Sequence, residues 1–122
     1  MKPIVLIIED DSTLNKIFSI ALRDDFEIIS YTAGEDAVLY LKDNAPNLVV
    51  LDLHLSGISG EDVLGVIHSQ EHLSKTKVIL TTAAERNAEL LRDQVDIVLL
   101  KPVSPKQLKD LALRLTKSPT GE

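Results

Sequence analysis

The 122-residue sequence contains no cysteine and no long apolar segment. The lack of cysteine excludes disulfide frameworks, cysteine-ligated zinc, iron–sulfur clusters and thiol nucleophiles. The longest apolar runs hold about five residues, far fewer than the ~20 that a membrane-spanning helix needs. Met1-Lys2-Pro3 leads directly into a strand-like run without a secretory signal pattern. We therefore expect a cytoplasmic protein that is not embedded in a membrane.

Positive charge is also in deficit, since 13 Lys and Arg stand against 19 Asp and Glu. The resulting net charge of −6 argues against binding to nucleic acid, which depends on clustered positive charge. The length is typical of one domain, and a hydrophobic content of 44% is enough to form a core. We expect one domain over residues 1–116 and a polar tail from Lys117 to Glu122.

Five short apolar runs predict β-strands. They are rich in β-branched residues and lack polar alternation, which is typical of strands buried on both faces of a parallel sheet. The runs are Ile4–Ile8, Phe26–Ile29, Leu48–Leu51, Val78–Leu80 and Ile97–Leu100.

Segments with helical spacing alternate with these runs, and the weakest of them is 85–94. The expected helix starts are an N-cap at Ser12, a Thr32–Glu35 capping box, Ser59 with Asp62, and Ser104 followed by Pro105. Parallel neighbours need right-handed crossovers. The order βαβαβαβαβα therefore predicts an α/β fold, a doubly wound five-stranded parallel sheet with helices on both faces.

In such sheets, ligands bind beyond the carboxyl ends of the strands. The polar residues at those ends are Glu9, Asp10, Asp11, Asp52, Thr81, Thr82 and Lys101. Each one alone fits a helix-terminal charge, a turn residue or a solvated cation. Gathered at one edge, they indicate a functional site. Close carboxylates repel one another unless a cation lies among them, and Mg²⁺ suits a site with few carboxylates plus phosphate.

The sequence resembles a response-regulator receiver domain of two-component signalling, of the chemotaxis-type single-domain kind. The resemblance covers about Lys2 to Thr116, and Thr82 follows Asp52 by the family's spacing of 30 residues. The matching motifs are Ile7-Ile8-Glu9-Asp10, Leu51-Asp52 with Ser59-Gly60, Thr82-Ala83 and Lys101-Pro102. It implies the flavodoxin-like (βα)5 receiver fold.

The resemblance also assigns roles to the candidate residues. Asp52 would be the phosphoacceptor, forming an acyl phosphate with a phosphoryl group from a sensor histidine kinase or phosphotransfer protein. Mg²⁺ would be bound by Asp10, Asp52 and the backbone carbonyl of His54. Glu9 would act on that metal through a bound water.

The remaining roles concern the phosphoryl group and the output. Lys101 would pair with the phosphoryl group, and Thr82 would donate a hydrogen bond to it. Asp11 is expected to serve the N-terminus of the following helix instead. The protein would signal through protein–protein contacts, as a monomer or weak homodimer, and would not be an enzyme beyond transfer to itself and autodephosphorylation.

Three positions depart from the family pattern. Lys101 follows Thr82 by only 19 positions, a shorter spacing than usual, and Val98 stands where receivers commonly carry Tyr or Phe. Ser56 replaces a common Pro, although Gly57 can still form a turn. The first two departures motivate an alternative, a receiver-like interaction module that works without phosphorylation.

Other readings of the polar residues remain open. A small Mg²⁺-dependent aspartyl phosphatase would need a second Asp two residues after the nucleophile, where this chain has His54. His54 is alternatively a metal ligand or phosphohistidine. His68 and His72 are four residues apart. This spacing fits either a pair that binds one metal on a helix or a solvated surface pair.

Overall fold

The computed structural model describes residues 1–117, and the chain forms alternating strands and helices as the sequence predicts. The elements are β1 (Ile4–Ile8), α1 (Ser12–Leu22), β2 (Glu27–Tyr31), α2 (Gly34–Asp43), β3 (Leu48–Asp52), α3 (Gly60–Ser69), η1 (Glu71–Leu73), β4 (Lys77–Thr82), α4 (Glu85–Leu91), η2 (Arg92–Gln94), β5 (Ile97–Leu100) and α5 (Pro105–Thr116). Within this part of the chain, no helix has the length and apolarity required to cross a bilayer.

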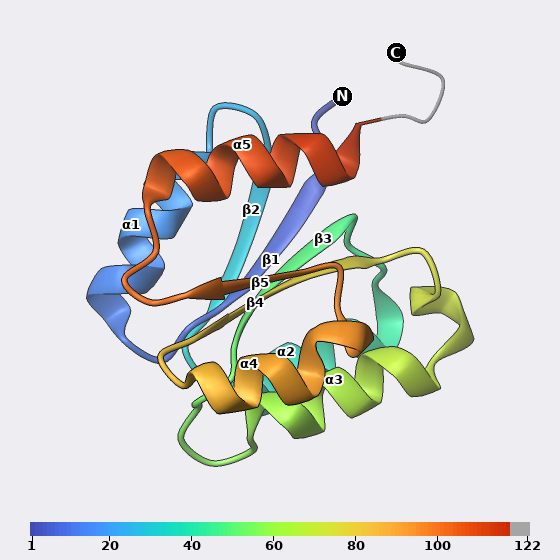
Figure 1. The fold of residues 1–122 in the computed structure, drawn as a ribbon. Helices are drawn as coiled ribbons and strands as arrows, with labels where there is room; N and C mark the ends of the chain where they lie inside the picture. The colour runs from blue at the N-terminus through green and yellow to red at the C-terminus, as the bar shows by residue number, and fades with distance from the viewer. Residues whose placement is uncertain (118–122) are drawn as a thin grey trace.

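The strands form one parallel sheet in the order β2-β1-β3-β4-β5. Helices α1 and α5 cover one face, and α2, α3 and α4 cover the other (Figure 1). This confirms the predicted doubly wound architecture. The strand order reverses beside β1, so the gap beyond the carboxyl ends of β1 and β3 is the expected ligand position.

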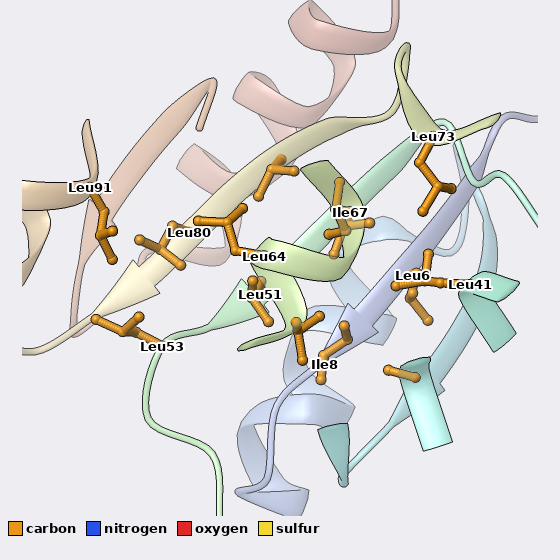
Figure 2. Close-up of a cluster of buried hydrophobic side chains, with 14 residues drawn as sticks. Leu6, Ile8, Leu41, Leu51, Leu53, Leu64, Ile67, Leu73, Leu80 and Leu91 are labelled. Atoms are coloured by element: carbon orange, nitrogen blue, oxygen red, sulfur yellow. The ribbon is translucent and has the colours of Figure 1, made fainter. Parts of the chain in front are cut away.

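Two hydrophobic clusters, one on each face, hold the layers together. Alternate residues of each central strand point to opposite faces, so Leu6 joins the cluster under α2 and α3, whereas Ile7 joins the one under α1 and α5. Figure 2 shows the first cluster, in which Leu64 and Ile67 of α3 meet Leu51 of β3. The expectation of burial on both faces is confirmed for β1, β3 and β4. It is wrong for the edge strands β2 and β5, which are only partly buried.

Several element boundaries differ from the sequence prediction. Strand β2 covers Glu27–Tyr31 rather than Phe26–Ile29, and β4 extends the predicted 78–80 to Lys77–Thr82. The weak helix at 85–94 divides into α4 and the 3₁₀ turn η2. Of the expected tail, only Lys117 lies within the described residues.

Two predicted helix caps are wrong. Asp11, not Ser12, is the N-cap of α1, because its carboxylate accepts hydrogen bonds from the backbone of Thr13 and Leu14. Helix α2 has no side-chain cap, so the Thr32–Glu35 capping box does not form. The Ser59–Asp62 capping box and the Ser104 cap are both confirmed.

The two histidines at 68 and 72 do not form a pair. Helix α3 ends at Ser69, so His68 lies in α3 and His72 in η1. Each ring contacts a different backbone oxygen. Nε2 of His68 is 2.8 Å from the Gln94 oxygen, and Nε2 of His72 is 2.7 Å from the Leu41 oxygen. The helical metal pair is therefore wrong. Both side chains are exposed, as the solvated-surface alternative expects, and each ring also contacts a backbone oxygen of another segment.

Candidate functional site

The carboxyl ends of four neighbouring strands place the candidate side chains. Asp52 is the last residue of β3 and Thr82 the last of β4, while Glu9 and Lys101 directly follow β1 and β5. Because parallel strands end at the same edge of the sheet, residues up to 92 positions apart meet there. The structure thus brings together the polar residues that the sequence singles out.

Three carboxylates form the centre of this site. Glu9, Asp10 and Asp52 each place an oxygen within 4.8 Å of the others. Glu9 and Asp52 are 1% and 2% exposed, whereas Asp10 faces solvent. Two buried acids with one exposed acid form a compact set of oxygen donors that opens on one side.

Lys101 neutralises part of this negative charge. Its Nζ lies 3.1 Å from Oε1 of Glu9 and 3.3 Å from Oδ1 of Asp52. Partial burial lowers the pKa of Lys101, but the hydrogen bond with Glu9 and the charge of Asp52 outweigh this effect and raise it overall. The ammonium group therefore stays charged between the two buried carboxylates.

Glu9 is the carboxyl group whose titration is most altered. Burial raises the pKa of Glu9 from its ordinary 4.5 to about 7, and the neighbouring Asp52 acts in the same direction. The backbone N–H of Asp11 and the ammonium of Lys101 oppose this shift. Without further positive charge, the site holds a proton on Glu9 up to near-neutral pH.

Backbone amides supply one hydrogen bond to each of the three carboxylates. The N–H of Asp11 donates to Glu9, and the N–H of His54 donates to Oδ1 of Asp52, both at 3.1 Å. The N–H of Ser56 donates to Oδ2 of Asp10 at 3.2 Å. These donors come from the β1–α1 and β3–α3 loops, so the loop backbones fix how the acids point.

The Thr82 hydroxyl lies beside a histidine. Its oxygen accepts a hydrogen bond from the backbone of Ala84 at 3.1 Å and is 3.3 Å from Nε2 of His54. The His54 backbone contacts Asp52, as described above, while its ring contacts Thr82. Asp11 acts as the α1 cap and so has the predicted structural role.

Two residues that support the site are not predicted from the sequence. Asn15 is 7% exposed, and its amide donates to the backbone oxygens of Glu9 and Tyr31, tying α1 to the ends of β1 and β2. A polar amide on the apolar face of a predicted helix is the signal that could have identified it. Glu35 accepts from the backbone of Ile58 in the β3–α3 loop, a contact with no local sequence signature.

A family model of the response regulator receiver domain matches residues 5–113. The chain therefore belongs to the response regulator receiver domain family. The expected resemblance to this family is thus confirmed, and a receiver domain is consistent with phosphorylation-based two-component signalling.

Curated relatives extend beyond the region of similarity. The DNA-binding response regulator MtrA of Mycolicibacterium paratuberculosis is 30% identical over 112 residues, which cover 88% of this chain and 48% of MtrA. The hybrid signal transduction histidine kinase D of Dictyostelium discoideum is 27% identical over 110 residues, 88% of this chain and 7% of that protein. The chain spans about half the length of MtrA.

Solved structures confirm the fold. The chemotaxis response regulator CheY4 of Vibrio cholerae superposes with a TM-score of 0.86 at 17% identity, covering 94% of this chain and 99% of CheY4. The response regulator DrrB of Thermotoga maritima gives a TM-score of 0.82 at 25% identity, covering 93% of this chain and 52% of DrrB. The flavodoxin-like (βα)5 arrangement is therefore the observed fold.

Proposed function

We propose that Asp52 accepts a phosphoryl group from a sensor histidine kinase or a phosphotransfer protein. The observation that carries this proposal is the pairing of a buried carboxylate, 2% exposed, with an ammonium group 3.3 Å away at the carboxyl edge of the sheet. Lys101 holds one oxygen of Asp52 in a fixed position and offers positive charge where phosphoryl oxygens would arrive.

The reaction is a displacement at phosphorus. A carboxylate oxygen of Asp52 attacks the phosphorus, and a new P–O bond forms while the bond to the donor's imidazole nitrogen or acyl oxygen breaks. The leaving group departs with that bond's electron pair. Lys101 then binds the phosphoryl oxygens, and the Thr82 hydroxyl donates a hydrogen bond to one of them.

The three carboxylates fit Mg²⁺, because their oxygens form a hard donor set whose charge exceeds that of Lys101. Asp10 and Asp52 would hold the ion together with the backbone carbonyl of His54, and Glu9 would assist from the outer shell. When bound, the ion neutralises charge on the incoming phosphoryl group. The chain's own residues orient Asp52 and exclude water from its buried side.

The proposal extends to the output and the location of the domain. A net charge of −6 disfavours direct contact of this domain with nucleic acid or an anionic membrane surface. We therefore propose a cytoplasmic domain that signals through protein–protein contacts, as a monomer or weak homodimer. It is not an enzyme in the catalytic-turnover sense, since each chain accepts one phosphoryl group.

Intact-protein mass spectrometry tests the proposal. After incubation with acetyl phosphate and Mg²⁺, we expect one added phosphoryl group, which is absent with EDTA and in Asp52→Asn. Asp11→Asn is the matched control, because Asp11 lies next to the candidate ligand Asp10 but caps α1. This variant should be phosphorylated. No adduct, together with no binding of beryllofluoride, would contradict the proposal.

A phosphorylation-independent interaction module is the second candidate. Val98 packs against the cluster under α2 and α3, and a groove of about 550 Å³ lies between α4 and the end of β5. The groove is lined by Glu85, Arg86, Ala88, Glu89, Arg92 and Leu100. Equal affinity of wild type and Asp52→Asn for a partner protein would support this candidate.

A further inference from the structure

The β3–α3 loop, residues 53–59, is held by carboxylates from two other parts of the chain. The backbone N–H of Ser56 donates to Oδ2 of Asp10, which follows β1, at 3.2 Å. The backbone N–H of Ile58 donates to Oε2 of Glu35, in the first turn of α2, at 3.1 Å. Of the two carboxylates that hold the loop, Asp10 is a candidate metal ligand, and Glu35 lies outside the site.

Two glycines show how closely the loop is seated on α2. Gly57 has a φ of +78°, and a Cβ at this position would lie 2.5 Å from Oε2 of Glu35. A Cβ at Gly34 would lie 2.4 Å from Cγ2 of Ile58. Gly34 has no room for a side chain beside Ile58, and the positive φ of Gly57 disfavours any other residue there, so the start of α2 and the loop pack closely. Glu35 therefore contacts a loop whose path is sterically defined.

Ser56 is the position where the resemblance leads one to expect proline. Proline has no backbone N–H and could not donate to Asp10. In this chain, the donor is present and is used. Asp10 is exposed, so without this hydrogen bond its carboxylate would rotate among several orientations before binding an ion.

We propose that the Ser56 N–H and the Glu35 carboxylate are positioning groups for the Mg²⁺ site. Glu35 fixes the loop at Ile58, and the loop then presents the Ser56 N–H that orients Asp10. In this orientation, Asp10 already places an oxygen within 4.8 Å of those of Glu9 and Asp52. The inference rests on the proposed Mg²⁺ site and adds the partners that organise its exposed ligand.

The test is the dissociation constant for Mg²⁺, measured by following backbone amide resonances during titration with MgCl₂. Ser56→Pro removes the N–H, and we expect Mg²⁺ binding about tenfold weaker, the lower end of what loss of an outer-shell partner costs. Ser56→Ala keeps the N–H and removes only the hydroxyl, so its affinity should equal that of wild type.

A second pair of variants tests Glu35 and does not depend on whether Ser56→Pro folds. Glu35→Ala should weaken Mg²⁺ binding, and Glu35→Gln should restore it, because the amide oxygen still accepts from Ile58. Asp36→Ala removes an exposed charge from the same helical turn and should leave the affinity unchanged. Weaker Mg²⁺ binding in both Glu35→Gln and Asp36→Ala would show a general effect of charge and overturn the positioning role.

The remaining outcomes separate this inference from the proposed function. Equal Mg²⁺ affinity in wild type, folded Ser56→Pro and Glu35→Ala would overturn the positioning role while the metal site stands. No Mg²⁺ binding by wild type would overturn the metal site and this inference together. A tenfold loss confined to Ser56→Pro and Glu35→Ala is the result that supports it.

Discussion

The imidazole Nε2 of His54 lies 3.3 Å from the hydroxyl oxygen of Thr82. The same oxygen accepts a hydrogen bond from Ala84, so the hydroxyl proton is what Thr82 can give to another group. Thr82 has only one such proton. Donation to His54 and donation to a phosphoryl group on Asp52 therefore exclude each other.

With Nε2 of His54 as the acceptor of the Thr82 hydroxyl proton, we predict that His54→Ala binds beryllofluoride more tightly than wild type, because the competing acceptor is removed. A neutral hydrogen bond contributes about 0.5–1.5 kcal/mol net, which corresponds to a gain of roughly two- to tenfold. Titration followed by fluorine NMR measures the affinity. In a Thr82→Ala background, His54→Ala should have no effect. Weaker binding by His54→Ala would mean that the imidazole donates to Thr82 rather than accepting from it.

The pKa of Glu9 predicts a pH dependence of stability in EDTA. Burial raises this pKa from 4.5 to about 7, so between these values the folded protein holds a proton that the unfolded chain has released. The stability that Glu9 contributes is present below pH 4.5 and is lost as the pH rises through about 7. Urea unfolding of wild type and Glu9→Gln across this range measures the effect.

The quantity to compare is the free energy of unfolding of wild type minus that of Glu9→Gln. Glutamine stays neutral at every pH, so this difference should fall as the pH rises from 4.5 to 7. A difference that stays constant over the range would contradict the account of a proton held on buried Glu9.

Thr81 carries a buried hydroxyl that has no hydrogen-bond partner among residues 1–117. It is 1% exposed and pairs directly with Asp52 in the sheet register. We predict that Thr81→Val raises the free energy of unfolding by about 1 kcal/mol, since a methyl group of similar shape replaces an unsatisfied polar atom. Urea denaturation measures this. Thr82→Val, which removes a hydroxyl with partners, should lower stability, and a loss of stability in Thr81→Val would contradict the prediction.

The sequence predicts most of the architecture because its apolar runs and caps act locally. Strands β1 and β5 have the predicted bounds, and Ser104 with Pro105 begins α5 as expected. Where two neighbouring residues can both cap a helix, the local pattern does not decide which of them is the N-cap. Asp11 takes the extended backbone conformation and caps α1, so Ser12 becomes its first helical residue.

Long-range contacts explain the other differences. Glu35 has the correct spacing for a capping box with Thr32, but its carboxylate bonds to Ile58, 23 residues away. The site acids and Lys101 are predictable because parallel strands end at one edge. The donors from Ser56 and His54 to those acids are backbone N–H groups, which every residue except proline carries. Residue type therefore shows that a donor is present but not which acid it bonds to.

Chemical trapping of the phosphorylated residue tests the central claim most directly. Borohydride reduces the carbonyl of an acyl phosphate to an alcohol with loss of phosphate. Reduction of protein treated with acetyl phosphate and Mg²⁺ therefore converts the phosphorylated aspartate to homoserine. Peptide mass spectrometry then locates it. We predict homoserine at position 52 and no modification there without Mg²⁺. Homoserine at Asp10 or Asp11 instead, or an acid-labile phosphoryl group on His54, would contradict the assignment of Asp52 as the phosphoacceptor.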